Sequence, residues 1–193
     1  MKVGFFGGSF DPFHFGHLSL MVEIKELCSF DRIFVCPAYV SPFKQDKPPI
    51  ATPSHRLEMV KRGVADLPWA EATDREIKRP PPSYTIDTVR RLIRGREDSF
   101  HLILAEDSLK GLSLWKEWET LLSLAPPVIG VRRGYPERKV RDLFPVARYV
   151  RTAVMEISSQ HIRERLAEGL YCGHAVPAKI LDYIADHHLY LRG

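Results

Sequence analysis

Residues 7–17 read GGSFDPFHFGH and follow directly on a short apolar run at residues 3–6. The apolar run predicts a buried strand that stops at the two glycines. Residues 17–27 then carry apolar side chains at helical spacing, and residues 32–36 form a second short apolar run. Strand, helix and strand within this length predict a βαβ unit and a parallel sheet.

Beyond this unit, helices continue to alternate with short apolar strands. Residues 37–53 are rich in proline and lysine without periodicity, which predicts a long loop, and Ser54 is expected to cap the helix that follows. Further strands are expected within residues 69–77 and at 101–105, 127–131 and 148–157, and further helices at 85–95, 114–122 and from near 159 and 177. The pattern predicts a single α/β domain over residues 1–193, with a doubly wound parallel sheet and ligands at the carboxyl ends of its strands.

Composition narrows the class of protein without selecting a function. The 193 residues are 45% hydrophobic and 27% charged, which is typical of one globular domain. The formal charge of +4 and the pI of about 9.0 fit either a solvated surface or a cleft that attracts phosphate groups. So mild an excess is not typical of a histone-like protein, and we expect no nucleic-acid partner.

The cysteines and the apolar segments indicate the cellular compartment in which the protein is expected. The chain has three cysteines and no C-x-x-C pair, so neither a disulfide framework nor a zinc site is indicated. The first apolar run is too short for a signal peptide, and no stretch approaches the roughly 20 apolar residues of a membrane span. We therefore expect a cytoplasmic protein without a membrane partner. The sequence leaves open whether it is a homo-oligomer.

Chemistry alone makes residues 7–17 a candidate phosphate site. Glycines let the backbone approach a ligand closely, and the N–H groups at the start of the next helix attract anions. His14 and His17 are three positions apart near that helix start, so both can point the same way, donate to phosphate oxygens and, when protonated, add positive charge. A simple tight turn, two ordinary histidines or a metal pair that lacks a close third ligand remain alternatives. The stretch is neither a P-loop nor a G-x-G-x-x-G fingerprint.

The same stretch resembles the G-G-x-F-x-P-x-H-x-G-H signature of the nucleotidyltransferase α/β-phosphodiesterase superfamily. Within that superfamily the chain is similar to bacterial nicotinate-mononucleotide adenylyltransferases. ISSQHIR at residues 157–163 resembles their I-S-S-T-x-I-R segment, SYTIDT at 83–88 matches another, and residues 176–190 follow their tail. The resemblance covers almost the whole chain and implies a Rossmann-like nucleotidyltransferase fold.

The resemblance also implies a set of site residues. Four residues are expected to neutralise charge during the reaction: His14, His17, Lys44 and Arg163. The contacts to ATP are expected from Gly7, Gly8, Ser9, Phe10, Gly16, Asp107, Ser158, Ser159 and Ile162. The nicotinate ring and its carboxylate are expected at Thr85, Trp115 and the amide of Lys116. From the residues alone, Lys44 reads as a solvated loop lysine, Ser158 and Ser159 as a helix N-cap pair, and Trp115 as a core aromatic on a helix.

Several positions depart from the pattern of that family. Phe43 stands where the family has a histidine before the lysine, which removes one hydrogen-bonding group. Ala105 and Glu106 replace a glycine and a small residue, and the added carboxylate would repel an anionic ligand unless it turns away. Arg132, in the segment RRGY, is a weaker candidate for a phosphate contact. Arg56 matches the family but is expected to be structural.

These residues fit a reaction without a covalent intermediate. No serine–histidine–aspartate or cysteine–histidine arrangement is evident, and a nucleotide phosphate is already an ionised nucleophile. The resemblance implies adenylyl transfer from ATP to nicotinate mononucleotide, with Mg²⁺ carried on the triphosphate and no metal site of the protein's own. The product would be nicotinate adenine dinucleotide, in NAD biosynthesis. Alternatives are an adenylyltransferase that uses nicotinamide mononucleotide or phosphopantetheine, and a non-catalytic nucleotide-binding protein.

Overall fold

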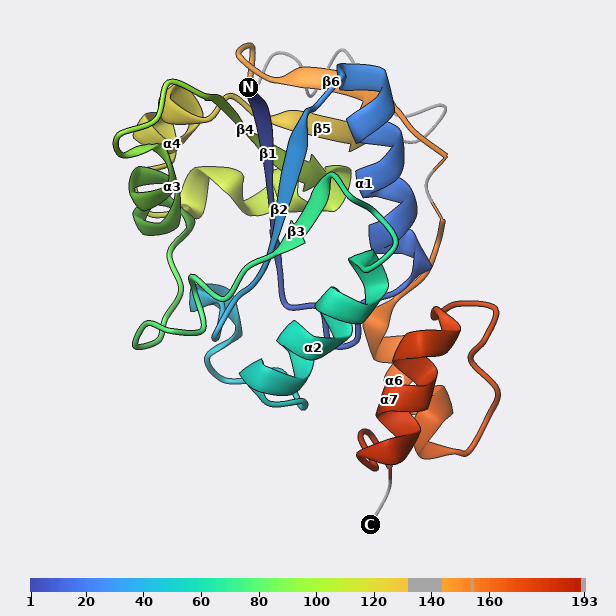
Figure 1. The fold of residues 1–193 in the computed structure, drawn as a ribbon. Helices are drawn as coiled ribbons and strands as arrows, with labels where there is room; N and C mark the ends of the chain where they lie inside the picture. The colour runs from blue at the N-terminus through green and yellow to red at the C-terminus, as the bar shows by residue number, and fades with distance from the viewer. Residues whose placement is uncertain (132–143, 154, 192–193) are drawn as a thin grey trace. The chain divides into compact units, whose positions relative to one another are not determined.

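A computed structural model describes residues 1–131, 144–153 and 155–191 of the chain (Figure 1). Helices and strands alternate along these residues in the order β1 (Lys2–Gly8), α1 (Phe15–Cys28), β2 (Arg32–Pro37), η1 (Pro42–Lys44), α2 (Pro53–Val64), β3 (Ala70–Ala72), α3 (Thr85–Ile93), β4 (Ser99–Ala105), η2 (Glu106–Leu114), α4 (Trp118–Leu124), β5 (Val128–Val131), β6 (Arg148–Arg151), α6 (Ser159–Ala167) and α7 (Ala178–Asp186). The two η elements are 3₁₀ helices. No described helix combines the length and the apolar character that crossing a bilayer requires.

The strands form a six-stranded parallel sheet in the order β3-β2-β1-β4-β5-β6. The chain starts at β1, adds β2 and β3 on one side, and returns to place β4 on the other side of β1. Strand order therefore reverses between β1 and β4, and such a point in an open α/β sheet is where ligands bind. The predicted α/β class and doubly wound parallel sheet are confirmed.

The chain divides into two compact units, each made of three segments. The first contains Met1–Gly7, Leu20–Phe34 and Tyr84–Val154. Within it, β4 pairs with β1 and β5, and all four residues of β5 are buried, as expected for a strand covered on both faces. Helices α3 and α4 pack together on the opposite side of these strands from α1 (Figure 1).

The second unit contains Gly8–Ser19, Val35–Ser83 and Met155–Gly193. It includes α2, which packs against both α7 and β3. Pro53 opens α2, and the helix is capped by Thr52, whose hydroxyl accepts from the His55 N–H at 3.4 Å. The expected cap, Ser54, is therefore wrong: Pro53 is well placed only as the first helical residue, and this puts Ser54 inside the first turn. The expectation of a single domain stays a prediction.

Most predicted elements are confirmed with small shifts of their ends, and one helix is not. The helix expected over residues 114–122 is replaced by the 3₁₀ helix η2, a turn at Trp115–Glu117, and α4. Glu117 has a left-handed φ of 51°, which interrupts any helix that runs through it. Trp115 is therefore the C-cap residue that follows η2, and the Trp118 N–H donates to its carbonyl at 3.2 Å. The strands expected at 69–77 and 148–157 are shorter, at β3 and β6.

Candidate active site

The turn that follows β1 is built on packing around Phe10. Gly7 and Gly8 are the last two residues of the strand, and neither has a left-handed backbone; that conformation falls on Phe10, with a φ of 49°. A Cβ atom at position 8 would lie 2.8 Å from the nearest atoms of the Phe10 ring, so any side chain there would clash with the ring. The need for a glycine at position 8 therefore follows from this close contact and not from a special backbone conformation.

His14 and His17 lie together at the start of α1. Their rings stack with centroids 3.7 Å apart, and Phe10 and Phe13 each lie within 5.5 Å of the His17 ring. The His14 N–H donates to Nδ1 of His17 at 3.3 Å. Because Nδ1 accepts, the hydrogen of a neutral His17 imidazole is carried by Nε2, which makes Nε2 a donor.

Both imidazoles are neutral at pH 7 in the ligand-free protein. Burial lowers the pKa of His14 to about 4. Burial, together with the charges of His14 and Lys44, lowers the pKa of His17 well below its ordinary value. The expectation that protonated imidazoles add charge at this site is therefore not met without a ligand, because desolvation disfavours the charged form. Nδ1 of His14 is buried and has no hydrogen-bond partner among the described residues.

One backbone amide at the N-terminus of α1 is already hydrogen-bonded within the protein. The Phe15 N–H donates to the Ala175 carbonyl at 2.9 Å, so this first amide of the helix is already satisfied. The next residue, Gly16, lies against His14, because a Cβ there would be 3.1 Å from two atoms of the imidazole ring. A side chain at position 16 would therefore displace His14, which explains the third glycine of the motif.

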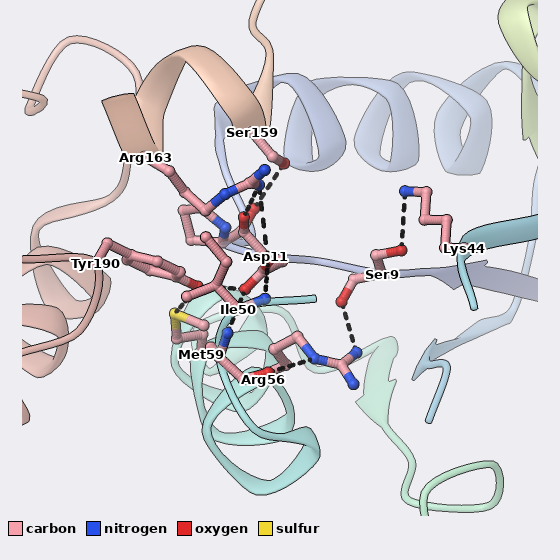
Figure 2. Close-up of polar contacts among 11 residues, drawn as sticks. Ser9, Asp11, Lys44, Ile50, Arg56, Met59, Ser159, Arg163 and Tyr190 are labelled. Atoms are coloured by element: carbon pink, nitrogen blue, oxygen red, sulfur yellow. Dashed lines mark hydrogen bonds and ion pairs between the residues drawn. The ribbon is translucent and has the colours of Figure 1, made fainter. Parts of the chain in front are cut away.

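Lys44 reaches the loop after β1 from the segment 37–53. The segment is a loop, as predicted, with the 3₁₀ helix η1 inside it. Lys44 ends η1, and its ammonium donates to the Ser9 hydroxyl at 3.1 Å (Figure 2). The neighbouring Phe43 is exposed. Lys44 therefore touches the loop, although its side chain remains exposed to solvent, and its expected contact with substrate phosphates stays a prediction.

Helix α6 brings Arg163 and Ser159 to the same loop. Nη1 of Arg163 donates to the Asp11 carbonyl at 2.7 Å, and the Ser159 hydroxyl donates to the Pro12 carbonyl at 3.1 Å (Figure 2). Ile162 is buried beneath them. Ser158 occupies the N-cap position, as expected, but its side chain makes no capping hydrogen bond. Ser159 is the first residue of the helix and not a second cap, and its hydroxyl bonds to the loop.

Arg56 joins this loop to two other segments. The guanidinium is 1% exposed and donates to the carbonyls of Ser9, Ala38, Tyr39 and Ala51 at 2.6 to 3.1 Å. A buried cation that gives all of these hydrogen bonds to backbone oxygens fixes three stretches of chain at once. This agrees with the structural role expected for Arg56.

Asp11 is a second such centre, and no sequence pattern indicated its partners. Its carboxylate is buried and accepts from the amides of Ile50 and Ala51 at 2.8 and 3.0 Å and from the Tyr190 hydroxyl at 2.8 Å. The only local signal is a charged residue set among aromatic ones in the motif. Its partners lie 39, 40 and 179 positions away, beyond any local pattern.

The remaining expected residues lie in the first unit. Gly7 is exposed at the end of β1, and Asp107 is exposed in η2. Thr85 is the first residue of α3, while Trp115 and Lys116 follow η2. Lys116 pairs with Asp87 at 3.3 Å, and its ammonium lies 4.7 Å from the centre of the Tyr84 ring. Glu106 opens η2 and is partly buried; Arg132 lies outside the described residues.

The described residues contain no group of three or more histidine, cysteine, aspartate or glutamate side chains placed to hold a metal ion. Residues 9–17 gather two imidazoles and the cations Lys44 and Arg163, which suit an anion better than a bare metal, and the one carboxylate among them, Asp11, accepts from Ile50, Ala51 and Tyr190.

Comparison with known proteins settles the family. Residues 5–165 match a family described as cytidylyltransferase-like. Two relatives bear the name "Probable nicotinate-nucleotide adenylyltransferase". The one from Hydrogenobaculum sp. is 35% identical over 192 residues and covers 100% of both chains; the one from Symbiobacterium thermophilum is 34% identical over 201 residues, covering 100% of this chain and 96% of its own. The chain belongs to the nicotinate-nucleotide adenylyltransferases of the cytidylyltransferase-like family.

Solved structures support the fold of this family. A Plasmodium falciparum nicotinic acid mononucleotide adenylyltransferase in complex with NaAD superimposes with a TM-score of 0.80 at 20% identity, over 98% of this chain and 97% of its own. The same enzyme in complex with APC gives 0.78 at 19% identity, over 98% and 96%. Agreement over such lengths confirms the nucleotidyltransferase fold.

Proposed function

We propose that the protein is an enzyme that transfers the adenylyl group of ATP to nicotinate mononucleotide, giving nicotinate adenine dinucleotide and pyrophosphate in NAD biosynthesis. The observation that carries the phosphate half is the gathering of Lys44, Arg163, His14 and His17 on one loop and helix tip. The acceptor half is supported by full-length relatives that carry this name.

The reaction is a direct displacement. An ionised oxygen of the mononucleotide phosphate attacks the α-phosphorus of ATP, and the bond from that phosphorus to the β-bridging oxygen breaks. No proton has to be removed from the nucleophile, and the leaving pyrophosphate takes the electron pair. The protein therefore has to align the two phosphates and stabilise the charge that collects on pyrophosphate.

The four charge-neutralising residues divide into two kinds of donor. Lys44 and Arg163 are permanent cations, and both already contact residues 9–11. His14 and His17 are neutral, so they act first as hydrogen-bond donors, His17 through Nε2. A triphosphate beside them would raise both pKa values, since a nearby anion favours the protonated imidazole.

The other contacts are proposed from the family pattern. ATP would be bound through Gly7, Gly8, Ser9, Phe10, Gly16, Ser158, Ser159 and Ile162, with Asp107 accepting from the ribose hydroxyls. Thr85, Trp115 and the amide of Lys116 would hold the nicotinate ring and carboxylate. ATP would enter as its magnesium complex, the metal held by phosphate and water oxygens.

The test is pyrophosphate release by the purified protein with ATP, Mg²⁺ and nicotinate mononucleotide, with the dinucleotide identified by mass. Parallel reactions use nicotinamide mononucleotide and phosphopantetheine. Turnover with nicotinate mononucleotide is expected to exceed both. Faster turnover of another acceptor would reassign the substrate, and tight ATP binding without turnover on any acceptor would favour a non-catalytic nucleotide-binding protein.

His17→Ala tests the role of the imidazole. Loss of a donor aimed at developing charge is expected to lower kcat by more than about a hundredfold. The dissociation constant for ATP, measured by calorimetry, should change much less. The matched control is His161→Ala in α6, whose side chain is 67% exposed and pairs only loosely with Glu164, at 3.9 Å. Equal losses in turnover and in ATP affinity would contradict the proposed role of His17.

A further inference from the structure

Tyr190 links the last described residues of the chain to the loop at its start. Its hydroxyl donates to Oδ1 of Asp11 at 2.8 Å, across 179 positions of sequence (Figure 2). Asp11 is 4% exposed and Tyr190 8%. Burial, the Asp11 charge and this hydrogen bond raise the pKa of Tyr190, so the phenol stays neutral and remains a donor.

This hydrogen bond completes the set of donors around the Asp11 carboxylate. Oδ1 accepts from the Ala51 amide and Tyr190, and Oδ2 accepts from the Ile50 amide and faces Nη1 of Arg163 at 3.6 Å. Three hydrogen bonds therefore hold the carboxylate, which has about four lone-pair sites, and the side of Oδ2 that remains faces the Arg163 cation as an ion pair. The carboxylate consequently has no alternative orientation with equally good partners.

The orientation of Asp11 controls where Arg163 lies. Nη1 of Arg163 is held at two points, the Asp11 carbonyl at 2.7 Å and Oδ2 at 3.6 Å. If Oδ1 lost the hydroxyl, the carboxylate could rotate toward other donors, and Oδ2 would leave its position beside Arg163. The guanidinium would then keep only its bond to the carbonyl.

We propose that Tyr190 is a positioning residue of the phosphate site, acting through Asp11 to fix Arg163 and the loop that Arg163 contacts. This role rests on the proposed adenylyl transfer, in which Arg163 stabilises the pyrophosphate charge. Tyr190 itself touches no reacting atom. The segment around it is thus part of the machinery of the site, because it supplies one of the three hydrogen bonds that hold the Asp11 carboxylate.

The test compares Tyr190→Phe with Tyr183→Phe. Both changes remove one hydroxyl from a tyrosine of the second unit that is mostly buried. The Tyr183 hydroxyl bonds to Nδ1 of His55 at 2.8 Å, away from residues 9–12. Tyr190→Phe is expected to lower kcat about tenfold, which corresponds to about 1.4 kcal/mol in the barrier, with KM for both substrates within about twofold. Tyr183→Phe should leave kcat unchanged. Equal effects of the two variants, or no effect of Tyr190→Phe, would overturn the proposal.

A double-mutant cycle separates positioning from general loosening. In an Arg163→Lys background, Tyr190→Phe is expected to lower kcat by less than about twofold, because its path runs through the guanidinium. A tenfold loss in both backgrounds would show that Tyr190 does not act through Arg163. If Tyr190→Phe does not fold, Asp11→Asn takes its place in the cycle: its loss of kcat, expected to exceed about tenfold in the wild-type background, should shrink to less than about twofold with Arg163→Lys, and an equal loss in both backgrounds would overturn the proposal.

A measurement without turnover keeps this inference separate from the proposed function. The Nε–H resonance of Arg163 in the ligand-free protein should shift and exchange faster in Tyr190→Phe but not in Tyr183→Phe. Unchanged resonances would overturn the positioning role whatever the reaction. A wild-type protein that turns over no acceptor, but shows the expected shifts, would refute the reaction and leave the Tyr190–Asp11–Arg163 link standing.

Discussion

Two polar networks in this molecule contain residues proposed to contact substrate, and they are built in opposite ways. Around the loop at residues 9–12, Asp11 and Arg56 are both at least 96% buried and hydrogen-bonded to backbone atoms on separate segments. Beside Trp115, in contrast, Lys116–Asp87 and Arg90–Glu117 are side-chain ion pairs whose members are 36% to 44% exposed.

The difference separates pre-organised geometry from adaptable geometry. A buried charge that loses a partner keeps its full desolvation cost, so the loop network has few alternative arrangements. An exposed ion pair exchanges its partner for water at little cost. Stabilising charge on pyrophosphate requires donors fixed in advance, which the buried network provides.

Arg56→Met gives the largest expected effect. Methionine fills much of the space but leaves carbonyls on three segments without their donor, so the free energy of unfolding should fall by about 4 kcal/mol. Urea denaturation followed by circular dichroism measures this loss. The control is Arg62→Met on the same helix, where the side chain is 40% exposed and pairs with Glu58; it should cost less than about 1 kcal/mol. Similar losses in both would remove the distinction between buried and exposed arginines.

Asp11→Asn should come next. The amide keeps the shape of the side chain but turns one acceptor into a donor that faces another donor, and it removes the charge opposite Arg163. We expect a loss of about 2–3 kcal/mol in the free energy of unfolding, and a fall in kcat larger than that of Tyr190→Phe. Asp66→Asn is the control, because Asp66 is 79% exposed in its pair with Lys179. A stable Asp11→Asn protein with normal kcat would show that the loop is not fixed by this carboxylate.

Sequence patterns predicted more of the fold than of the candidate site. Apolar runs located the strands because a parallel sheet is buried on both faces, and the helix expected over residues 85–95 is confirmed as α3, which ends just before Gly95 with its φ of 72°. The helix expected at 114–122 failed because the left-handed backbone of Glu117 has no signature in apolar spacing. The cytoplasmic location, the absence of a nucleic-acid partner and the oligomeric state stay predictions.

At the site, local motifs predicted which residues are present, but they did not predict the properties that depend on contacts between residues distant in the sequence. The motif placed His14 and His17 at the helix tip, and the resemblance brought Lys44 and Arg163 to the same loop. The charge state of the imidazoles could not be read from their spacing, because it depends on burial. Tyr190 was missed as a site residue for a similar reason: its partner is 179 positions away.

Lowering the pH should destabilise the fold through the buried His14, by less than either the Arg56 or the Asp11 substitution. The unfolded chain binds a proton at His14 below the ordinary pKa of 6.5, whereas the folded chain does so only near pH 4. Between these values the unfolded state holds more protons, so stability rises with pH and is lost as pH falls from 6.5 toward 4. From pH 7 to pH 5 the loss from His14 should be about 2 kcal/mol. His14→Asn should reduce this pH dependence in urea titrations; an unchanged dependence would place its origin elsewhere.

Glu117→Gln should have the smallest effect, and it tests the exposed side of the comparison. Two hydrogen bonds from Arg90, at 2.6 and 3.0 Å, hold the pKa of Glu117 below its ordinary value, yet both side chains are open to solvent. Water and salt can replace this pair, so neither the melting temperature at 0.15 M salt (roughly physiological) nor KM for nicotinate mononucleotide should change measurably. Repeating the melt at low salt sharpens the test, because only there should wild type gain over the variant. A loss like that of Asp11→Asn would mean that the turn at Trp115 is as rigidly fixed as the phosphate loop, and pre-organisation would then extend to the acceptor side.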